Sequence, residues 1–483
     1  MHRMVPRPQR RDCQPSLLGL SRWHWTASVR SSQAAVDRVL NDQGRRCLVA
    51  ALASRPIAVD LFAGAGGLSL GLEQAGFEVV AAVEYDPTHA LVHQFNFPAC
   101  QVVCRDVKQI DAADVLTAAR LGAARIGRRL ANGADIDLVA GGPSCQGFSS
   151  GGQREEDDER NNLLLEFVRL VVEIRPRAFL LENVPGLLET RFDQFREHAF
   201  KLLRNAGYAL SGTKSWINAN DYGVPQVRKR IIVTGILDGP PAGRPNSQNV
   251  GLTVRQALAG LPEVEEYPEL LLSDRATLRP VDLARRNGTV GYARQLTGLS
   301  EHSDFSRPRI WDSTAITGSR RTVHTPATSK RFEEVPQGEV EPISRLFRLD
   351  WDKPARTLRA GTGRERGAHT SPRPIHPSLP RVITVREAAR LHGYPDWFQF
   401  GVTNWHGHRQ VGNSVPPPLA RAVGSILVSA LGFRPGRLKR AIPLGDEAWL
   451  AARPSRAAAL TGALNDELPS QRRRSLSQSE PTQ

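Results

Sequence analysis

Between residues 55 and 234, short apolar runs alternate with longer segments in which apolar residues recur at helical spacing. The runs are short and mostly end near glycine or an acidic residue, as do strands buried inside a parallel sheet. The predicted strands are 57–62, 79–83, 102–104, 136–140, 178–181 and 231–234, and the predicted helices include 68–75, 163–174 and 195–206. This alternation predicts an α/β fold, with a mostly parallel sheet covered by helices on both faces.

Residues 235–383 break this rhythm, because they are rich in proline, glycine and arginine and hold few periodic stretches. They predict a second, irregular domain. The helical pattern returns at 385–391 and 418–431, so we expect the chain to re-enter the first domain. The predicted division is a basic, disordered N-terminal arm at 1–54, a core domain at 55–234, a second domain at 235–383, a returning part of the core domain at 384–431, and a disordered tail at 432–483.

The chain has 483 residues and a formal charge of +15, which suggests a polyanionic partner. Much of this charge lies at the two ends of the chain. Residues 1–54 contain nine arginines and three aspartates, and residues 432–483 contain nine basic and five acidic residues. No apolar run approaches the roughly 18 residues that span a bilayer, and five scattered cysteines make no disulfide scaffold. The sequence therefore argues against a membrane-spanning protein and favours a reducing, cytoplasmic setting.

A glycine-rich turn at 64–67 follows the first predicted strand and precedes a helix. Glycines let a backbone approach a ligand closely, and the start of a helix offers free N–H groups. Glu84 comes at the end of the next strand, where an acid binds a ribose diol, and Asp106 follows the third strand. Ser69 replaces the third glycine of the dinucleotide pattern, so a compact adenosine ligand is favoured over a dinucleotide.

Cys145 lies soon after a predicted strand, in the segment Gly-Gly-Pro-Ser-Cys-Gln-Gly at 141–147. The carboxyl ends of strands carry the chemistry in such sheets, and flanking amides can stabilise a thiolate there. A lone cysteine is more often a small buried apolar group, but these polar, glycine-rich flanks argue against burial. Cys145 is therefore the candidate nucleophile.

Two further strand ends carry charged side chains. Glu182 follows the strand at 178–181 and could lie opposite Cys145. Gln226, Arg228 and Arg230 alternate just before another strand, so they share one face that could bind a carbonyl or a phosphate. Taken one at a time, each of these residues is better explained as part of a strand-end salt bridge.

Two histidines and two cysteines near the second and third strands raise the question of a zinc site. They are His89, His93, Cys100 and Cys104. The spacing His-x3-His followed by Cys-x3-Cys is not a common zinc pattern. We therefore predict no metal site, and place the two histidines on a helix.

Together these motifs resemble the DNA (cytosine carbon-5) methyltransferase family of bacterial type. The matching segments are Asp-Leu-Phe-Ala-Gly-Ala-Gly-Gly at 60–67, Glu84 with Tyr85, Asp106, Pro-Ser-Cys-Gln at 143–146, Glu-Asn-Val at 182–184, Gln226-x-Arg228-x-Arg230, Arg-Glu at 386–387, Leu-His-Gly-Tyr-Pro at 391–395 and Gly-Asn-Ser-Val-Pro at 412–416. The resemblance covers most of the chain but neither tail. It implies a Rossmann-like methyltransferase fold, with 235–383 as a smaller, irregular target-recognition domain.

The resemblance implies S-adenosylmethionine as the cofactor. Glu84 would bind the ribose and Asp106 the adenine amino group, while the glycine turn would hold the methionine part. Arg105 stands where the family often has glycine. The full implied set is Phe62, Ala63, Gly64, Gly66, Gly67, Leu68, Glu84, Tyr85, Asp106, Val107, Pro143, Leu163, Asn413, Ser414 and Val415.

The resemblance also implies the reaction, which is methyl transfer to carbon 5 of cytosine in a specific duplex sequence. Cys145 would add to carbon 6, and Glu182 would hydrogen-bond ring N3 and the exocyclic amine. Arg230 would bind the O2 carbonyl, with Arg228 supporting it electrostatically. The base must leave the duplex by flipping, and residues 146–162 resemble the loop that closes over it.

Basic stretches at 316–331 and 353–381 suit contact with phosphates, and arginine can also read guanine edges. The residues predicted to contact DNA are Gln146, Ser149, Arg356, Arg359 and Arg364. The expected partner is double-stranded DNA. The family's usual state leads us to expect a monomer.

Two other functions fit parts of the sequence. The same chemistry could act on structured RNA such as tRNA, as in one branch of the family, although the long recognition region and Ser144 favour DNA. A catalytically inactive DNA-binding regulator would keep the fold, but every predicted catalytic position is filled. A solitary methylase and one paired with a cognate restriction endonuclease look alike from one chain.

Overall fold

The computed structural model describes most of the chain from residue 55 to residue 463. The described ranges are 55–131, 135–143, 162–248, 251–299, 304–361 and 373–463. The predicted N-terminal arm lies outside them.

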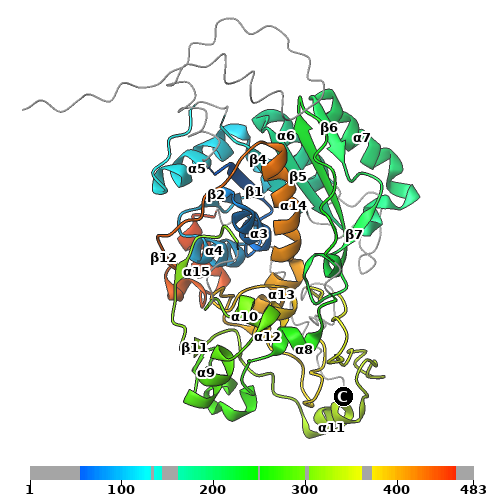
Figure 1. The fold of residues 1–483 in the computed structure, drawn as a ribbon, viewed down its shortest axis with the longest axis vertical. Helices are drawn as coiled ribbons and strands as arrows, with labels where there is room; N and C mark the ends of the chain where they lie inside the picture. Colours follow the sequence, from blue (N-terminus) through cyan, green and yellow to red (C-terminus); the bar gives the residue numbers. More distant parts are fainter. Residues whose placement is uncertain are drawn as a thin grey trace, which may run out of the picture. The chain divides into compact units, whose positions relative to one another are not determined.

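A mixed eight-stranded sheet forms the centre of the described part (Figure 1). Its strands are β1 (Ile57–Leu61), β2 (Glu78–Val83), β3 (Gln101–Val103), β4 (Leu138–Gly141), β5 (Ala178–Asn183), β6 (Tyr208–Ser211), β7 (Trp216–Asn218) and β8 (Lys229–Leu237). They lie in the order β3-β2-β1-β4-β5-β8-β6, and β7 also pairs with β8. The first five of this order run parallel, whereas β8 is antiparallel to β5, β6 and β7. The prediction of a mostly parallel sheet is confirmed, with the antiparallel strands at one edge.

Consecutive residues of β4 show how helices cover both faces. Leu138 and Ala140 belong to a cluster with residues of α3 (Gly67–Ala75) and α14 (Pro417–Ala430). Val139 belongs to a cluster with residues of α5 (Ala112–Arg125), α6 (Asn162–Ile174) and α7 (Asp193–Asn205). Side chains alternate along a strand, so an unbroken apolar run supplies both faces. The helices that follow the first strands are α3 (Gly67–Ala75), α4 (Pro87–Asn96), α5 (Ala112–Arg125), α6 (Asn162–Ile174) and α7 (Asp193–Asn205).

The second half of the described chain adds no strand to the main sheet. Its α-helices up to residue 430 are α8 (Val254–Leu258), α9 (Pro280–Asn287), α10 (Gly291–Leu296), α11 (Pro326–Glu334), α12 (Val385–Leu391), α13 (Asn404–Asn413) and α14 (Pro417–Ala430). Short strands β9 (Ala276–Thr277) and β11 (Ala315–Ile316) pair with each other. Few elements and many prolines make this half irregular, as its composition leads one to expect.

Helix α14 returns to the sheet and packs closely on α3. A Cβ on Gly71 would come within 2.3 Å of the Ala420 Cβ, and one on Gly424 within 2.7 Å of the Ala75 Cβ. The two helices therefore touch through positions that need glycine. This contact brings the residues just before α14 to the glycine turn at the start of α3.

The segment after α14 departs from the sequence prediction, which places a disordered tail at 432–483. Residues 432–463 instead hold β12 (Ile442–Pro443), a 3-10 turn (Glu447–Trp449) and α15 (Pro454–Thr461). Leu450 is buried in the same cluster as Phe95 of α4, and Leu444 and Trp449 pack against it. Apolar side chains buried against the body order this segment despite its polar flanks. Residues 464–483 lie outside the described ranges.

Candidate active site

The predicted glycine turn lies at the carboxyl ends of β1 and β2. Phe62 adopts a positive φ of 58°, which is uncommon for a bulky residue and typical of constrained sites. The Ala63 N–H donates to Val83 O at 3.0 Å, which ties the turn to β2. A Cβ on Gly66 would lie 2.4 Å from the Phe97 ring, whereas one on Gly64 would meet no atom of the described residues within 4 Å. The turn is thus packed from behind and open in front of Gly64.

Glu84 is fixed beside this turn. Its Oε2 accepts from Gly64 N and its Oε1 from Asp86 N, both at 2.8 Å. Burial raises the pKa of Glu84, and nearby His89 opposes that rise. A carboxylate with two fixed donors keeps its remaining lone pairs in a set direction, which suits binding of a diol.

A buried network of hydrogen-bonded side chains supports the glycine turn. The Ser69 hydroxyl donates to Asp60 Oδ2 at 2.6 Å, and Ser69 Oγ lies 2.9 Å from His93 Nε2. Burial raises the pKa of Asp60 to about 7, although Ser69 donates to it, and burial lowers the pKa of His93 to about 3. His93 therefore stays neutral, and it links α4 to β1 through Ser69 of α3.

Residues that precede α14 lie against the glycine turn. A Cβ on Gly67 would come within 2.5 Å of both Val415 O and Tyr394 Oη, and within 2.9 Å of the Ser414 Cβ. Ser414 and Val415 are buried there, whereas Asn413 is exposed at the end of α13. The structure thus brings Ser414 and Val415 to the turn from about 350 positions away in the chain.

The other predicted cofactor residues lie after β2, β3 and β4, in the glycine turn and in the first turns of α3 and α6. Asp106 accepts from Lys108 N at 3.0 Å, Val107 is buried, and Tyr85 is 41% exposed. Pro143 is buried two residues after the end of β4, and Leu163 lies partly buried in the first turn of α6. Ala63 and Leu68 are buried in the glycine turn and the first turn of α3.

A second charged group lies at the carboxyl end of β5. Glu182 Oε1 lies 2.7 Å from Arg230 Nε, and each side chain is 12% exposed. A Cβ on Gly142 would come within 3.0 Å of Glu182 Oε2, so the end of β4 lies against this carboxylate. The Glu182–Arg230 pair therefore lies beside Gly142, and Cys145 follows Gly142 by three residues in the sequence.

The family match agrees with this arrangement. The sequence model of the C-5 cytosine-specific DNA methylase family matches residues 58–429, which span both halves of the site. The chain belongs to this family. The chain is thus a DNA cytosine-5-methyltransferase, and the family implies S-adenosylmethionine as the methyl donor.

Relatives and solved structures agree with the family match. The chain is 45% identical over 410 residues to Type II methyltransferase M.XorII of Xanthomonas oryzae pv. oryzae, covering 85% of this chain and 93% of the relative. It is 28% identical to Type II methyltransferase M.AgeI of Thalassovita gelatinovora, covering 77% and 99%. A crystal structure of a candidate DNA modification methyltransferase encoded within a prophage (E. coli) matches with a TM-score of 0.60 at 33% identity, covering 78% of this chain and 99% of that one.

Arg228 of the methylase lies in a different environment from Arg230. Its guanidinium donates to Leu358 O at 2.9 Å, to Gly412 O at 2.9 Å and to Ser414 O at 3.0 Å, and the side chain is buried. The sequence predicts electrostatic support for the target base. The contacts instead join the residue before β8 to Leu358 and to the 412–414 segment, which reaches the glycine turn.

Replacing Arg228 with leucine is expected to lower the free energy of unfolding by about 3–5 kcal/mol, because three buried carbonyls lose their donor. Lysine should recover only part of this loss, since one ammonium cannot reproduce the planar fork. Denaturant unfolding followed by circular dichroism measures both. The neighbouring variant Lys229→Leu, which removes an exposed contact with the Trp216 ring, should cost less than about 1 kcal/mol. An equal cost for both leucine variants would contradict this role.

The Gln226 side chain also makes structural contacts, to residues far away in the sequence. Its Oε1 accepts from Leu358 N at 3.0 Å, and its Nε2 lies 3.0 Å from His392 Nδ1. The backbone of Val227 pairs with Ala355 at 2.8 Å. The residues just before β8 thus hold the segment at 355–358 beside the candidate active site.

A hairpin that the sequence pattern does not predict contacts this segment through Arg356. Residues 338–348 form it, with Val340 paired to Phe347, and the Arg356 guanidinium lies 3.8 Å from the centre of the Phe347 ring. At its tip Ile343 is 70% exposed and Arg345 adopts a φ of 60°. The run Glu-Pro-Ile-Ser-Arg at 341–345, rich in turn-forming residues, is the signal that could have predicted it.

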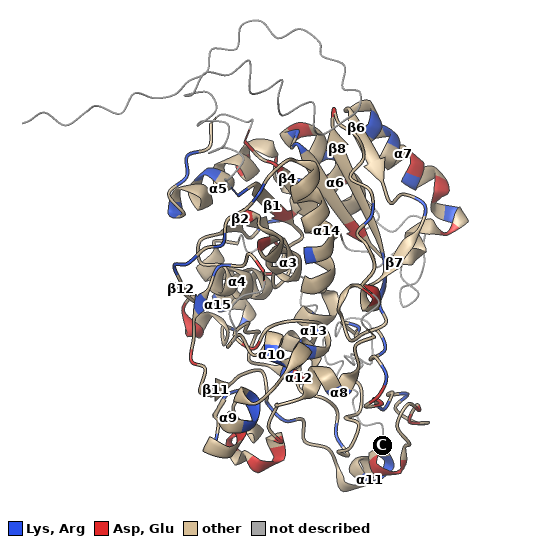
Figure 2. Cartoon of the chain, in the orientation of Figure 1, with Lys and Arg blue, Asp and Glu red and all other residues tan. Residues whose placement is uncertain are grey.

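Several predicted residues lie outside the described ranges, namely Cys145, Gln146, Ser149, Arg364 and the loop at 146–161. Arg356 and Arg359 are described and exposed. Basic and acidic side chains are interspersed on α7 and around α9 (Figure 2), so those helices form no purely basic surface.

Neither the histidines nor the cysteines considered for zinc form a cluster. In the described ranges, no three His, Cys, Asp or Glu side chains are placed to hold a metal ion. Cys100 and Cys104 are buried, and His93 contacts Ser69. Among the helices that the structure describes, none is both long and apolar enough to cross a membrane.

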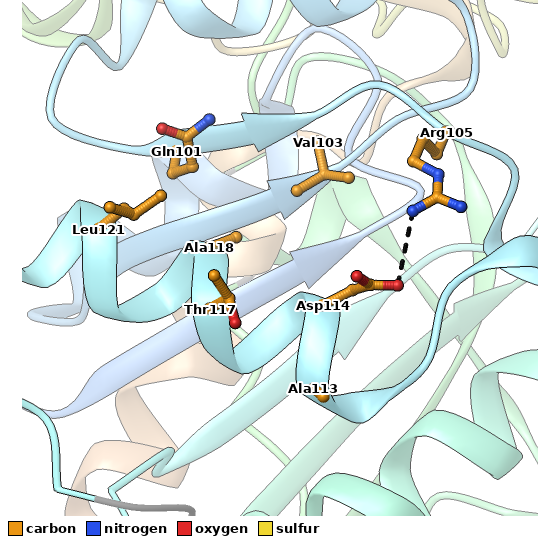
Figure 3. Close-up of a pocket in the computed structure, with 8 residues that line it drawn as sticks. All are labelled: Gln101, Val103, Arg105, Ala113, Asp114, Thr117, Ala118 and Leu121. Carbon is orange, nitrogen blue, oxygen red and sulfur yellow. Dashed lines mark ion pairs between the residues drawn. The ribbon is translucent and has the colours of Figure 1, made fainter. Parts of the chain in front are cut away.

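A surface hollow of about 270 Å³ lies between β3 and α5 (Figure 3). Gln101, Val103 and Arg105 line one side, and residues of α5 line the other. Asp114 of α5 lies 3.5 Å from Arg105 across it. None of the predicted cofactor residues lines this hollow, so it is separate from the active site.

Proposed function

We propose that this methylase transfers a methyl group to carbon 5 of cytosine in a specific duplex DNA sequence, by base flipping and a covalent Cys145 adduct. The observation that carries the proposal is the Glu182–Arg230 pair at 2.7 Å, with the end of β4 against it. Cys145 follows Gly142 by three residues, so the chain leads from this pair to the nucleophile. A carboxyl and a guanidinium side by side match N3, the amine and O2 on one edge of cytosine.

The geometry of the glycine turn supports the assignment of the cofactor site. No described residue fills the space in front of Gly64, which leaves room for a ligand, and two backbone donors fix Glu84 beside it. S-adenosylmethionine would supply an electrophilic methyl group there. Glu84 would bind its ribose hydroxyls, and the residues around β3 and β4 would enclose its adenosine.

The covalent step follows from the chemistry of cytosine, whose carbon 5 is a poor nucleophile. The Cys145 thiolate adds to carbon 6, which makes carbon 5 electron-rich. Glu182 holds N3 and the exocyclic amine, and Arg230 stabilises the charge that develops on O2. Once carbon 5 carries the methyl group, a base such as water takes the carbon 5 proton. The electrons of that C–H bond restore the ring double bond, and the thiolate leaves.

Replacing Glu84 with alanine is expected to raise the dissociation constant for S-adenosylmethionine by about 10- to 100-fold, because two hydrogen bonds to a charged acceptor are lost. Calorimetric titration measures this constant. The control is Glu78→Gln at the opposite end of β2, where Glu78 pairs with Arg55 at 3.0 Å. Unchanged affinity in the Glu84 variant would remove the ribose role.

The hairpin at 338–348 is a candidate for contact with DNA bases. Glu341 holds its tip rigid, because this buried carboxylate accepts from the Ser344 N–H and lies 3.2 Å from Arg331. An exposed aliphatic side chain and an arginine on a rigid tip suit a thymine methyl and a guanine edge.

Replacing Arg345 with alanine is expected to weaken binding to the cognate duplex by about 5- to 150-fold and to reduce discrimination against altered sites. Fluorescence anisotropy with cognate and scrambled duplexes measures both effects. Leu272→Ala serves as a control, because Leu272 is 83% exposed in another part of the chain. If the Arg345 variant bound both duplexes as tightly as the wild type binds the cognate one, Arg345 would contribute to discrimination alone. If neither the affinity nor the discrimination changed, the assignment would be refuted.

The names of the relatives favour a Type II restriction–modification system, with a cognate endonuclease as partner. The test of the proposed function is expression in a host without cytosine methylation, followed by base-resolution sequencing of 5-methylcytosine. Methylation confined to one short motif is the expected result. Protein that binds S-adenosylmethionine, leaves DNA unmodified and methylates tRNA would instead identify an RNA methyltransferase.

A further inference from the structure

The described segment at 438–463, which we call the C-terminal strap, lies beyond residue 429, where the family match ends. It contains β12 and α15, and α15 lies beside α4 (Figure 1). Helix α4 begins three residues after Glu84 and is buried at every position except Gln94. A helix flanking a sheet normally keeps one polar, exposed face, so a helix buried all round needs a second cover. The strap supplies it.

Backbone hydrogen bonds join the strap to α4 and to its neighbours. The Gly445 N–H donates to Phe95 O at 2.9 Å, and the Val402 N–H donates to Leu450 O at 3.1 Å. A Cβ on Gly445 would come within 2.8 Å of the Phe95 Cα and 2.9 Å of the Trp449 ring, so only glycine allows this approach. Strand β12 also pairs in parallel with β10 (Arg309–Ile310).

The segments that the strap joins belong to the two sides of the proposed cofactor site. Helix α4 leads back to Glu84, and the loop at 399–402 leads into α13, which ends at Asn413. Asn96 of α4 exchanges two hydrogen bonds with Gln399, at 2.9 and 3.1 Å. At the other end of α4, Thr88 Oγ1 lies 3.4 Å from His406 Nδ1 of α13. The strap therefore covers the seam between two segments that are distant in the sequence.

We propose that the C-terminal strap is a positioning element of the methylase that holds α4 against the 399–413 segment, and so sets the affinity for S-adenosylmethionine. This inference rests on the proposed binding of the cofactor by Glu84 and the residues after α13. Within the described residues, no hydrogen bond or ion pair joins the strap to Glu182, to Arg230 or to the hairpin at 338–348. Its loss therefore acts on cofactor binding and leaves the chemical step and the affinity for DNA unchanged.

The experiment compares a chain that stops after Arg437 with one that stops after Ala463, which keeps the strap. Two point variants of the full chain, Gly445→Val and Trp449→Ala, keep the test valid if the shorter chain does not fold. Titration calorimetry gives the dissociation constant for S-adenosylmethionine, steady-state kinetics give kcat, and fluorescence anisotropy gives DNA affinity. Glu447→Ala is the matched surface control, because this side chain contacts Arg275 at 2.8 Å.

We expect the strap variants to raise the dissociation constant for S-adenosylmethionine about ten-fold, with kcat at saturating cofactor and DNA affinity within about two-fold of wild type. The chain ending at Ala463 and the Glu447 variant should match wild type. Unchanged cofactor affinity together with a lower melting temperature would reduce the strap to a stabilising cover and overturn the proposal. Parallel losses of cofactor and DNA affinity would also overturn it. Failure of the proposed function is a separate result, in which the wild-type chain itself binds no S-adenosylmethionine.

Discussion

Replacing Cys145 with alanine is expected to lower methyl transfer by at least about 10³-fold, with affinities for S-adenosylmethionine and DNA within about two-fold of wild type. Without the thiolate, carbon 5 of cytosine keeps its low nucleophilicity, and no positioning by other residues replaces the adduct. Transfer of a labelled methyl group to duplex DNA measures the reaction. Titration calorimetry and anisotropy measure the two affinities.

The matched control for this variant is Cys100→Ala. Cys100 is 1% exposed, and burial raises the pKa of its thiol well above the usual range, so it stays protonated. Its loss should leave methyl transfer within a few-fold of wild type. Wild-type turnover by the Cys145 variant would remove Cys145 from the mechanism, while equal losses in both variants would indicate a general effect of removing a thiol.

A second readout follows the adduct directly. A duplex with fluorine at carbon 5 of the target cytosine has no proton for the base to remove, so the covalent complex should accumulate. It should appear on a denaturing gel with the wild-type and Cys100→Ala chains and be absent with Cys145→Ala. A complex formed by the Cys145 variant would place the nucleophile on another residue.

The sequence predicts the sheet well where each strand is a continuous apolar run. Strand β4 is such a case, because Leu138, Val139 and Ala140 each belong to an apolar cluster. A short run in which every residue is apolar is typical of a strand buried on both faces. The apolar pattern does not predict β6 and β7. Both are short and carry partly exposed residues such as Leu210 and Trp216, so their pattern does not differ from that of a loop.

Gly64, Glu84, Asp106 and Glu182 lie at one edge of the sheet, because each is at or just after the carboxyl end of one of its parallel strands. The contacts of each residue could not be predicted in the same way. Arg228 and Arg230 are equivalent in the sequence, yet one binds three backbone carbonyls and the other binds Glu182. What separates them is the position of the 358 and 412–414 segments, and long-range packing decides that.

The motif at 386–395 shows that a family motif can act through packing. Thr384 and Glu387 form a capping box on α12, and Glu387 pairs with Arg381 at 2.9 Å. Burial alone would raise the pKa of Glu387, but Arg381 and Thr384 lower it to about 2. The carboxylate therefore stays ionised in its pair across the working range of pH. This holds the turn that presents Tyr394 to Gly67.

Replacing Glu182 with glutamine is expected to lower kcat by about 10²- to 10⁴-fold, because an amide cannot exchange a proton with N3 as the base is activated. Glutamine keeps the shape of the side chain, and its carbonyl can still accept from Arg230. Arg230→Met should also lower kcat, by about 10²- to 10³-fold, since the charge on O2 loses its donor. Single-turnover methyl transfer at saturating cofactor and DNA separates these losses from binding.

The double variant decides whether the two side chains act as one unit. Because Glu182 Oε1 and Arg230 Nε lie 2.7 Å apart and face the same base, the double variant should lose little more activity than Glu182→Gln alone. Asp137→Asn provides the control: Asp137 pairs with Arg177 at 2.9 Å at the opposite end of the sheet, so its loss should lower stability but not kcat. Fully additive losses in the double variant would show that the two residues act on separate steps. A Glu182→Gln chain as fast as wild type would exclude the carboxylate from activation of the base.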